Sequence, residues 1–281
     1  MLIDKPAGPT SHDVVARVRR ALGTRAVGHA GTLDPFATGL LVLLIGGATR
    51  LARFVERLPK GYLAEATLGA ATDTDDGTGH VTARRPLDPW PGESEIRVAL
   101  ASLVGTQPQR PPAYSARRVE GRRGYELARS GAAVALPPRD VTVYGIELLQ
   151  WIPPVVQLRA TVSAGTYVRA LARDLGERLG TVAHCSALRR EWIGPFRTEA
   201  ALAPDQVTAH TPLLSPLELL AGMPHQVLDP DGAIAVRHGR SLPAEPEPLE
   251  GEVALVYEGR LLAVAQRVEQ RWQPRVVLEP A

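Results

Sequence analysis

The sequence predicts an α+β protein with a mixed, largely antiparallel sheet flanked by helices, followed by a small β-rich domain. Strand-like and helix-like segments alternate irregularly, whereas a doubly wound parallel sheet requires regular alternation. Several expected strands lie only a few residues apart, which favours antiparallel hairpins. Near residue 225 the pattern changes, and three short strand-like runs follow. We therefore predict a large domain over residues 1–225 and a small one over residues 226–281.

The first half of the chain predicts three helices and two strands. Ser11 is the expected N-cap of the first helix, because apolar residues follow it at helical spacing until Gly23. Residues 24–39 are rich in glycine, threonine and aspartate and are interpreted as a loop. The apolar run at residues 40–45 suits a buried strand. The other elements are expected at residues 48–58 (helix), 62–68 (strand) and 93–103 (helix).

The second half predicts a strand pair, one helix and a terminal group of strands. Residues 141–151 and 155–162 form the pair, with a connection at Pro153–Pro154. The helix is expected over residues 166–179, where large apolar residues recur every four positions. The terminal strands are expected near residues 253–257, 261–266 and 272–278.

The composition predicts a folded, soluble protein. Hydrophobic residues make up 44% of the 281 residues, so the chain can bury a full core. The longest apolar run is too short to span a bilayer, and the first residues lack a basic leader with an apolar segment behind it. We therefore expect a cytoplasmic protein. The single cysteine, Cys185, agrees, because one thiol cannot form an internal disulfide.

Charge is distributed unevenly along the chain. Residues 1–228 carry 26 basic and 21 acidic side chains, a net charge of +5, whereas residues 229–281 carry 6 and 9, a net charge of −3. The larger part is therefore the better candidate for binding a polyanion. The chain contains 30 arginines but only two lysines, Lys5 and Lys60. A compact ammonium cannot replace a planar guanidinium freely, so these two positions are candidates for specific roles.

The glycine-rich stretch at residues 28–39 contains the best candidate for a catalytic residue. Asp34 precedes a proline, which disfavours the helical conformation and presents the carboxylate on a loop before a buried strand. Such a carboxylate can act as a nucleophile or as a general base. The alternative is that Asp34 only forms an Asx-turn.

Motifs for nucleotide loops and zinc proteases are missing from the sequence, which contains no GxxxxGK[ST], GxGxxG or HExxH pattern. The acidic stretch at residues 73–77 departs from the EF-hand pattern, and we interpret it as a solvated turn. We therefore expect no metal and no cofactor.

Seven short blocks together resemble the bacterial TruB family of tRNA pseudouridine-55 synthases. In family order, they are KPAGPTSH at 5–12, GHAGTLDP at 28–35, KGY at 60–62, GAATDT at 69–74, QRPPAYSA at 109–116, GTYVR at 165–169 and ALRR at 187–190. Both lysines fall inside these blocks. The resemblance covers roughly residues 3–195 and implies a pseudouridine-synthase core, and the terminal β-rich segment resembles a PUA-type RNA-contacting domain.

The resemblance implies a tRNA-modifying isomerase that converts the T-loop uridine at position 55 to pseudouridine. The glycosidic bond is cleaved, the base rotates, and it is reattached through C5. Asp34 and Arg169 are implied as the catalytic residues, with Arg169 paired to the Asp34 carboxylate. The implied substrate-binding residues are His29, Tyr62, Tyr167, Leu188 and Lys5. From the sequence alone, the two tyrosines and Leu188 also fit a core position, and His29 also fits a turn.

A basic stretch after residue 109 is the candidate for contacts with the RNA backbone. It contains Arg110, Arg117, Arg118, Arg122 and Arg123. Clustered arginines bind phosphates and make affinity fall with salt. A solvated basic face is the alternative interpretation. The expected partner is the T stem-loop of tRNA, with no membrane, no obligate protein partner and a monomeric state.

Other functions remain compatible with the sequence. One is a non-catalytic module that binds or folds tRNA, and another is a uridine isomerase that acts on a different RNA. A third is a metal-dependent hydrolase that uses Asp34, Asp73, Asp75, Asp76 and His80. For the isomerase, the sequence leaves open whether Asp34 attacks C1′ of the ribose or removes a proton from C2′.

Overall fold

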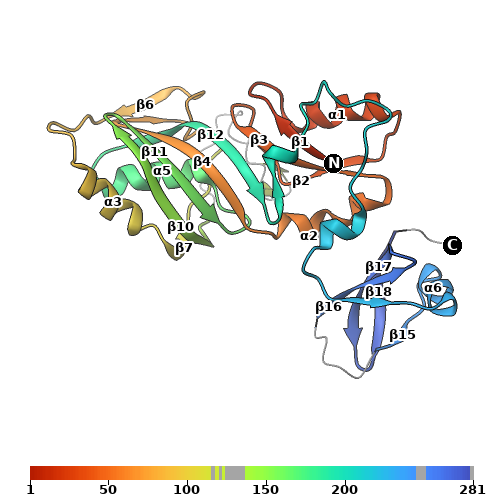
Figure 1. Ribbon diagram of the computed structural model, residues 1–281. Coiled ribbons are helices and arrows are strands. Elements are labelled where there is room, and N and C mark those ends of the chain that lie inside the picture. The colour runs from red at the N-terminus through yellow and green to blue at the C-terminus, as the bar shows by residue number, and fades with distance from the viewer. Residues whose placement is uncertain (115–117, 120–121, 124–136, 245–250, 279–281) are drawn as a thin grey trace.

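The computed structural model describes residues 1–114, 118–119, 122–123, 137–244 and 251–278. Two sheets organise these residues, one of nine strands and one of five (Figure 1). The first sheet has the order β1-β3-β12-β4-β11-β10-β7, with β2 paired to β3 and β13 paired to β12. Its strands are β1 (Leu2–Lys5), β2 (Val27–Ala30), β3 (Thr38–Ile45), β4 (Lys60–Leu68), β7 (Gly105–Gln109), β10 (Arg139–Ile152), β11 (Val155–Val162), β12 (Ala183–Ile193) and β13 (Phe196–Arg197).

Most neighbouring strands of both sheets are antiparallel. Among the described residues, parallel pairing occurs between β12 and β3 and between two strands of the smaller sheet, β14 (His225–Val227) and β16 (Glu252–Tyr257). Together with the helices, this arrangement confirms the predicted α+β class with a mixed, largely antiparallel sheet. The approach of β3 to β12 requires a glycine: at Gly39, φ is +100°, and a Cβ atom there would overlap the backbone carbonyl of Arg190.

The first helix, α1 (Ser11–Leu22), corrects one prediction. Its N-cap is Thr10, whose side chain accepts a hydrogen bond from the backbone of Asp13, whereas Ser11 is the first helical residue. Both residue types cap helices well, so the sequence does not separate them. The Ser11 hydroxyl is used elsewhere, since it bonds both backbone groups of Leu33. Gly23 ends the helix with φ of 64°, as the left-handed C-cap position favours.

Four further segments differ from the predictions. The expected loop at residues 24–39 includes β2, which pairs with β3. The expected helix at residues 48–58 is a 3-10 turn, η1 (Gly46–Leu51), followed by the short helix α2 (Ala52–Glu56). The expected helix at 166–179 is α5 (Val168–Arg178), because Tyr167 has extended backbone angles. A short hairpin of β5 (Ala70–Thr72) and β6 (Val81–Arg84) was not predicted.

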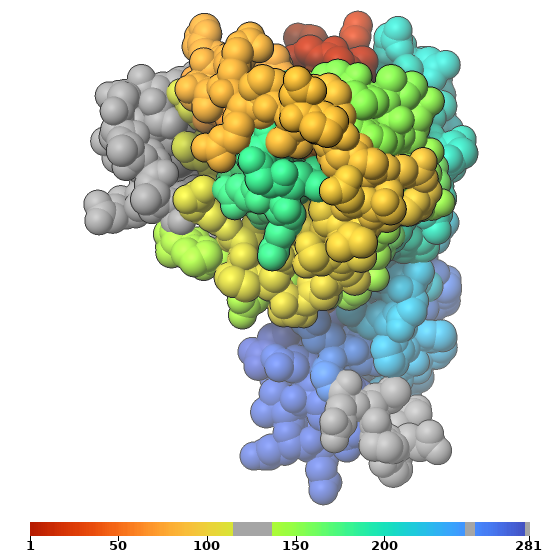
Figure 2. Space-filling view, turned by 90° about the vertical axis from the view of Figure 1, so that its left-hand side faces the viewer, coloured from red at the N-terminus to blue at the C-terminus, as the bar shows by residue number. Residues whose placement is uncertain are grey.

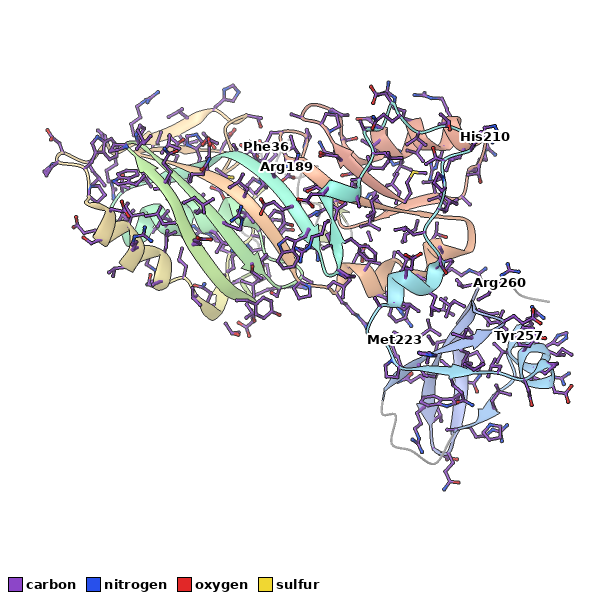
Figure 3. The ribbon with its side chains drawn as sticks, in the orientation of Figure 1. Phe36, Arg189, His210, Met223, Tyr257 and Arg260 are labelled. Carbon is purple, nitrogen blue, oxygen red and sulfur yellow. The ribbon has the colours of Figure 1, made fainter. Side chains whose placement is uncertain are left out.

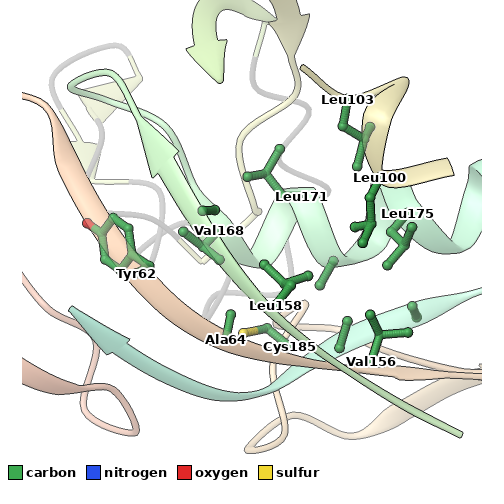
Figure 4. Packing of buried hydrophobic residues seen from close by; sticks show 14 of the residues in the cluster. Tyr62, Ala64, Leu100, Leu103, Val156, Leu158, Val168, Leu171, Leu175 and Cys185 are labelled. Atoms are coloured by element: carbon green, nitrogen blue, oxygen red, sulfur yellow. The ribbon is translucent and has the colours of Figure 1, made fainter. Parts of the chain in front are cut away.

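Two helices, α3 (Glu93–Ala101) and α5, pack on one face of the large sheet. Figure 4 shows Val168, Leu171 and Leu175 of α5 facing the strands, opposite Ala64, Leu158 and Cys185. All six side chains belong to one buried cluster, which also includes Leu100 and Leu103 from the α3 side. The helix α5 therefore packs on the sheet along its length, and this packing sets the position of its N-terminal end relative to the strands.

The second sheet has the order β14-β16-β17-β18-β15. Its other strands are β15 (Leu242–Pro243), β17 (Arg260–Val268) and β18 (Arg271–Val277), and the helix α6 (Pro230–Arg237) packs beside them. Figure 2 shows these residues as a lobe below the main body. The expected strands at 253–257, 261–266 and 272–278 correspond to β16, β17 and β18, which confirms a β-rich C-terminal part.

The two sheets share a hydrophobic cluster. It joins Leu44 and Phe54 of the first part of the chain to Val256 and Leu261 of the second sheet. Met223, labelled in Figure 3 where the chain enters the second sheet, packs against the same cluster. At the edge of this contact, Glu252 of β16 pairs with two exposed arginines at α2, at 3.2 and 3.5 Å. Exposed pairs of this kind contribute little, so the apolar cluster holds the two sheets together.

No helix among the described residues is long and apolar enough to cross a membrane.

Candidate active site

A cavity of about 320 Å³ opens beside Asp34. Its walls come from the loop after β2, the strands β4 and β12, and the N-terminal end of α5. The lining residues are Gly31, Thr32, Leu33, Asp34, Glu56, Lys60, Tyr62, Gly165, Thr166, Tyr167, Val168, Arg169, Leu188 and Arg190. Segments that are distant in sequence thus form one pocket. Five of the seven residues that the resemblance implied as catalytic or substrate-binding line it, together with Lys60.

Asp34 and Arg169 form an ion pair at this cavity. Arg169 Nε lies 2.9 Å from Asp34 Oδ2, and Arg169 Nη2 donates a hydrogen bond of 3.2 Å to Asp34 Oδ1. The guanidinium therefore contacts both carboxylate oxygens, with a hydrogen bond at Oδ1 and a close ion-pair contact, outside hydrogen-bond geometry, at Oδ2. The Arg169 side chain is 3% exposed, whereas that of Asp34 is 35% exposed. The arginine is part of the protein interior, and the carboxylate faces the cavity.

Arg169 is held in place by three other contacts. Its Nη1 donates to Asp76 Oδ2 at 3.2 Å and to the carbonyl of Thr74 at 2.6 Å. Its Nη2 also donates to the carbonyl of Tyr114 at 2.9 Å. Because a buried arginine costs free energy unless its donors are paired, these contacts stabilise the charge as well as its orientation.

The Asp34 loop is fixed by the segment that carries Lys5. Lys5 Nζ donates to the carbonyl of Pro35 at 3.2 Å and to that of Pro6 at 2.8 Å. On the other side of Asp34, Ser11 bonds the backbone of Leu33 at 2.9 and 3.0 Å. Lys5 is fully buried and does not line the cavity. The first two motif blocks thus form one unit, in which residues 5–12 hold the loop that presents Asp34.

Burial perturbs the ionisable groups around the cavity. It raises the pKa of Asp34, and the adjacent Arg169 opposes this rise. Burial lowers the pKa of Lys5 to about 8 and that of Lys60 to about 8. It also lowers the pKa of His29. Groups whose pKa is perturbed in a cleft are typical of functional sites.

The predicted pocket residues divide into two groups. Tyr62 of β4, Tyr167 before α5 and Leu188 of β12 line the cavity. His29 does not; it lies on β2 opposite Leu43, and its buried Nδ1 has no hydrogen-bond partner among the described residues. Tyr62 and Leu188 are also members of the main apolar cluster, so each of them is both a core residue and a cavity-lining residue.

The predicted basic stretch lies partly outside the described residues. Arg110 is described and exposed. The backbone of Arg118 pairs with that of Arg123 in a short strand pair, β8 (Arg118–Val119) with β9 (Arg122–Arg123), and Val119 pairs with Arg122. Arg117 falls outside the residues that the structure describes.

The acidic stretch at residues 73–77 is not the solvated turn that we expected. Asp76 is 4% exposed and contacts Arg169, and Asp75 pairs with Arg173 of α5 at 2.7 Å. Arginines of the helix thus neutralise both carboxylates, which explains why they can be buried. Across the described residues, no group of three or more histidine, cysteine, aspartate or glutamate side chains is placed to hold a metal ion.

Three residues around the site were not given these roles from the sequence, although Asp76 was named there as a candidate of a metal-dependent hydrolase. Asp76 and Arg173 take part in the arginine–aspartate contacts, and Arg190 donates from inside the protein to the carbonyls of Gly31 and Leu40. For Arg173 there was a signal, because it follows Arg169 by four residues on a predicted helix and therefore shares its face. For Asp76 the sequence carried no comparable signal, since its partner is 93 residues away.

The comparisons with known proteins agree with these features. The family model described as TruB family pseudouridylate synthase, N-terminal domain, matches residues 19–168, and the tRNA pseudouridylate synthase B C-terminal domain model matches residues 169–215. A tRNA pseudouridine synthase B from Thermobifida fusca is 42% identical over 287 residues, covering 99% of this chain and 97% of the relative. Another from Opitutus terrae is 46% identical over 209 residues, covering 74% and 86%.

The fold also matches solved structures. A chain in the crystal structure of a Cbf5–Nop10–Gar1 complex has a TM-score of 0.74 and 26% identity, covering 99% of this chain and 85% of that chain. A chain in an H/ACA RNP bound to a substrate RNA containing 2′-deoxyuridine has a TM-score of 0.73 and 25% identity, with the same coverage.

Proposed function

Because the chain belongs to the TruB family of pseudouridylate synthases, we propose that its cavity isomerises the T-loop uridine at position 55 of tRNA, with Asp34 as the catalytic residue. The relatives that cover nearly the whole chain are named for tRNA, which supports this substrate over another RNA. The observation that carries the proposal is the ion pair of Asp34 with the buried Arg169, at the wall of a cavity that a base can enter.

Access to the uridine requires base flipping. The target atoms lie inside a folded loop. Extruding the nucleotide from this loop costs roughly a few kcal/mol, because the base loses its stacking and pairing contacts. Stacking on an aromatic side chain returns about 1–3 kcal/mol. Tyr62 lines the cavity from β4, and we assign it this stacking role. Tyr167 and Leu188 form the remaining walls, and His29 fills space left by the extruded nucleotide.

The reaction is an isomerisation and balances without a co-reactant. The bond between N1 and C1′ breaks, the uracil rotates, and a bond forms between C5 and C1′. The proton on C5 is released and N1 takes up a proton from solvent, so the product has the same atoms as the substrate. Asp34 either attacks C1′ to give a covalent intermediate or removes a proton from C2′ to give a glycal. Both routes require an ionised carboxylate. Arg169 supports this state, because its charge opposes the rise in the pKa of Asp34 that burial causes.

The rest of the chain is assigned by the same proposal. We place the domain boundary near residue 225, where β14 begins the second sheet, and assign residues 226–281 a PUA-like, RNA-contacting role. The backbone of the tRNA contacts Arg110, Arg117, Arg118, Arg122 and Arg123. The protein acts in the cytoplasm as a monomer, without an obligate protein partner, cofactor or metal ion.

Tritium release from tRNA labelled at uridine C5 tests the function. We expect about one tritium per tRNA from the wild type, lost when the T-loop uridine is replaced. Asp34→Asn should bind tRNA but release no tritium, because an amide neither attacks C1′ nor accepts the proton. Asp88→Asn is the matched control, since Asp88 is exposed and also precedes a proline.

Each alternative function gives a different result. A folded wild type that binds tRNA without releasing tritium would be a binding or folding module. Release from labelled rRNA fragments but not from tRNA would move the activity to another RNA. Loss of activity in EDTA, restored by a divalent cation, would identify a metal-dependent enzyme.

A further inference from the structure

The helix α5 carries a second arginine, Arg173, one turn after Arg169. Residues four apart on a helix lie on the same face, so both side chains point toward the turn at residues 72–78. Arg173 is 14% exposed and is absent from the residues that line the cavity beside Asp34. A direct contact with the flipped base is therefore not its role.

Arg173 makes ionic contacts with two aspartates. Its Nη1 lies 2.7 Å from Asp75 Oδ2. Its Nε and Nη2 lie 3.1 and 2.9 Å from Asp174 Oδ1. Nη2 also donates to the carbonyl of Arg110 at 2.9 Å. The guanidinium thus joins α5 to the acidic turn and to the stretch that follows β7.

These contacts repeat the pattern of Arg169. Arg169 bonds the carboxylate of Asp76 and the carbonyl of Tyr114, whereas Arg173 bonds the adjacent carboxylate, Asp75, and the carbonyl of Arg110. Each arginine therefore connects the same turn to the same five-residue stretch. Arg173 thereby contacts the residue next to Asp76 in the turn, and the residue four positions before Tyr114 in the stretch.

The start of this stretch has another attachment to α5. Gln109 is 3% exposed, and its amide oxygen accepts a hydrogen bond of 2.8 Å from the backbone of Tyr167. Its amide nitrogen donates to the carbonyl of Tyr167 at 3.2 Å. Residues 109–114 are thus docked on the N-terminal part of α5 at both ends and at Arg110.

The turn itself depends on outside support. Asp75 has a φ of 59°, in the left-handed region that few residues other than glycine, asparagine and aspartate adopt. Its backbone accepts a hydrogen bond from Cys185 and donates to Thr72, while its side chain reaches Arg173. A conformation of this kind persists where surrounding contacts fix it.

We propose that Arg173 is a positioning residue for the isomerisation, which holds the Asp75–Asp76 turn and the Arg110–Tyr114 stretch so that Arg169 stays aligned with Asp34. The proposal rests on the proposed function, because it assigns Arg173 an effect on the step that Asp34 performs. Without Arg173, Asp76 and the Tyr114 carbonyl lose their anchored neighbours, and the Arg169 guanidinium turns away from the carboxylate in part of the molecules.

A single-turnover experiment separates positioning from a merely structural role. Excess enzyme is mixed with C5-tritiated tRNA, and the rate constant, the final amplitude and the Kd for tRNA are measured. Three variants are compared with the wild type. Arg173→Met removes the charge but keeps the stem, Asp75→Asn keeps a residue type that tolerates positive φ, and Arg178→Met is an exposed control on the same helix.

We expect the rate constant of Arg173→Met to fall at least tenfold, with a complete amplitude and a Kd within twofold of the wild type. The rate constant of Asp75→Asn should fall by at least threefold. The rate constant of the double variant should be no lower than that of Arg173→Met alone, because the two side chains act through one contact. Arg178→Met should match the wild type. If Arg173→Met fails to fold, Asp75→Asn decides alone. A fall of at least threefold in its rate constant would support the proposal, and a rate constant within twofold of the wild type would overturn it.

A rate constant within twofold of the wild type in both site variants would overturn the proposal. So would a loss confined to the amplitude, since fewer folded molecules reduce the amplitude but leave the rate constant unchanged. An inactive wild type would instead contradict the proposed function, so the two failures can be told apart.

Discussion

Replacing Arg169 by lysine tests the central contact of the site. Lysine keeps the positive charge but has one nitrogen in place of a planar fork. In the wild type, three guanidinium nitrogens serve two carboxylates and two carbonyls: Asp34, Asp76, and the carbonyls of Thr74 and Tyr114. One ammonium cannot bond both Asp34 oxygens and also reach Asp76, so at least one charged contact is lost.

The contacts that lysine cannot make determine the expected fall in turnover of Arg169→Lys. A hydrogen bond to a charged group contributes about 1.5–3 kcal/mol, and about 1.4 kcal/mol corresponds to a tenfold change in rate. If the lost contact orients Asp34 in the transition state, turnover should fall roughly 10- to 150-fold. Because Arg169 is 3% exposed, the variant should also be less stable.

Single-turnover tritium release at saturating enzyme measures this effect. Circular dichroism and an unfolding curve show that the variant is folded at the assay temperature. Arg178→Lys, on the same helix but exposed, is the control for the substitution itself. A rate constant within twofold of the wild type would refute the role of Arg169, because a point charge alone would then be sufficient.

Three further predictions concern stability and binding. Gly61→Ala should destabilise the fold by about 1–3 kcal/mol in urea unfolding, because a Cβ there overlaps the Trp192 indole, whereas Gly145→Ala meets open space and should be neutral. The pKa of Lys60 is lowered from its ordinary value of 10.5 to about 8 in the folded state. Between pH 8 and 10.5 the unfolded chain therefore binds more protons than the folded one, and the contribution of Lys60 to the free energy of unfolding rises with pH. Lys60→Met should remove that rise, and an unchanged dependence of the unfolding free energy on pH would contradict the prediction. Neutralising Arg117, Arg118, Arg122 and Arg123 together should weaken tRNA binding and flatten its salt dependence, and an unchanged salt slope would place the RNA elsewhere.

The sequence predicted the larger elements of the fold because they bury a periodic apolar face. The segments at residues 62–68 and 155–162 are strands of the large sheet, and α5 follows its predicted period apart from its first two residues. Short elements were missed where tertiary contacts decide the conformation. β2 is a glycine-containing stretch whose strand geometry depends on pairing with β3, and β5 and β6 are short strands on either side of the acidic turn at residues 73–77.

The site was predicted in part for a similar reason. Asp34, Tyr62 and Arg169 lie in short motifs that a sequence displays directly. Their supports do not, since Asp76 reaches Arg169 across 93 residues and Ser11 reaches Leu33 across 22. Buried polar groups need partners, but a single sequence does not show which distant group supplies them. The acidic turn was therefore misinterpreted as solvated, whereas its carboxylates neutralise two arginines of α5.

The hydrophobic cluster common to both sheets determines whether the two sheets unfold together or separately. Leu44 and Phe54 on one side and Val256 and Leu261 on the other are all at most 7% exposed, so separating the sheets would hydrate both sides at once. We expect one calorimetric transition whose van't Hoff and calorimetric enthalpies agree, rather than two independent ones. The short helix α2 lies in this cluster and ends at Glu56, on the cavity wall. Substitutions in the C-terminal sheet that weaken the cluster should therefore lower the melting temperature of the catalytic part, although they lie far from Asp34 in sequence.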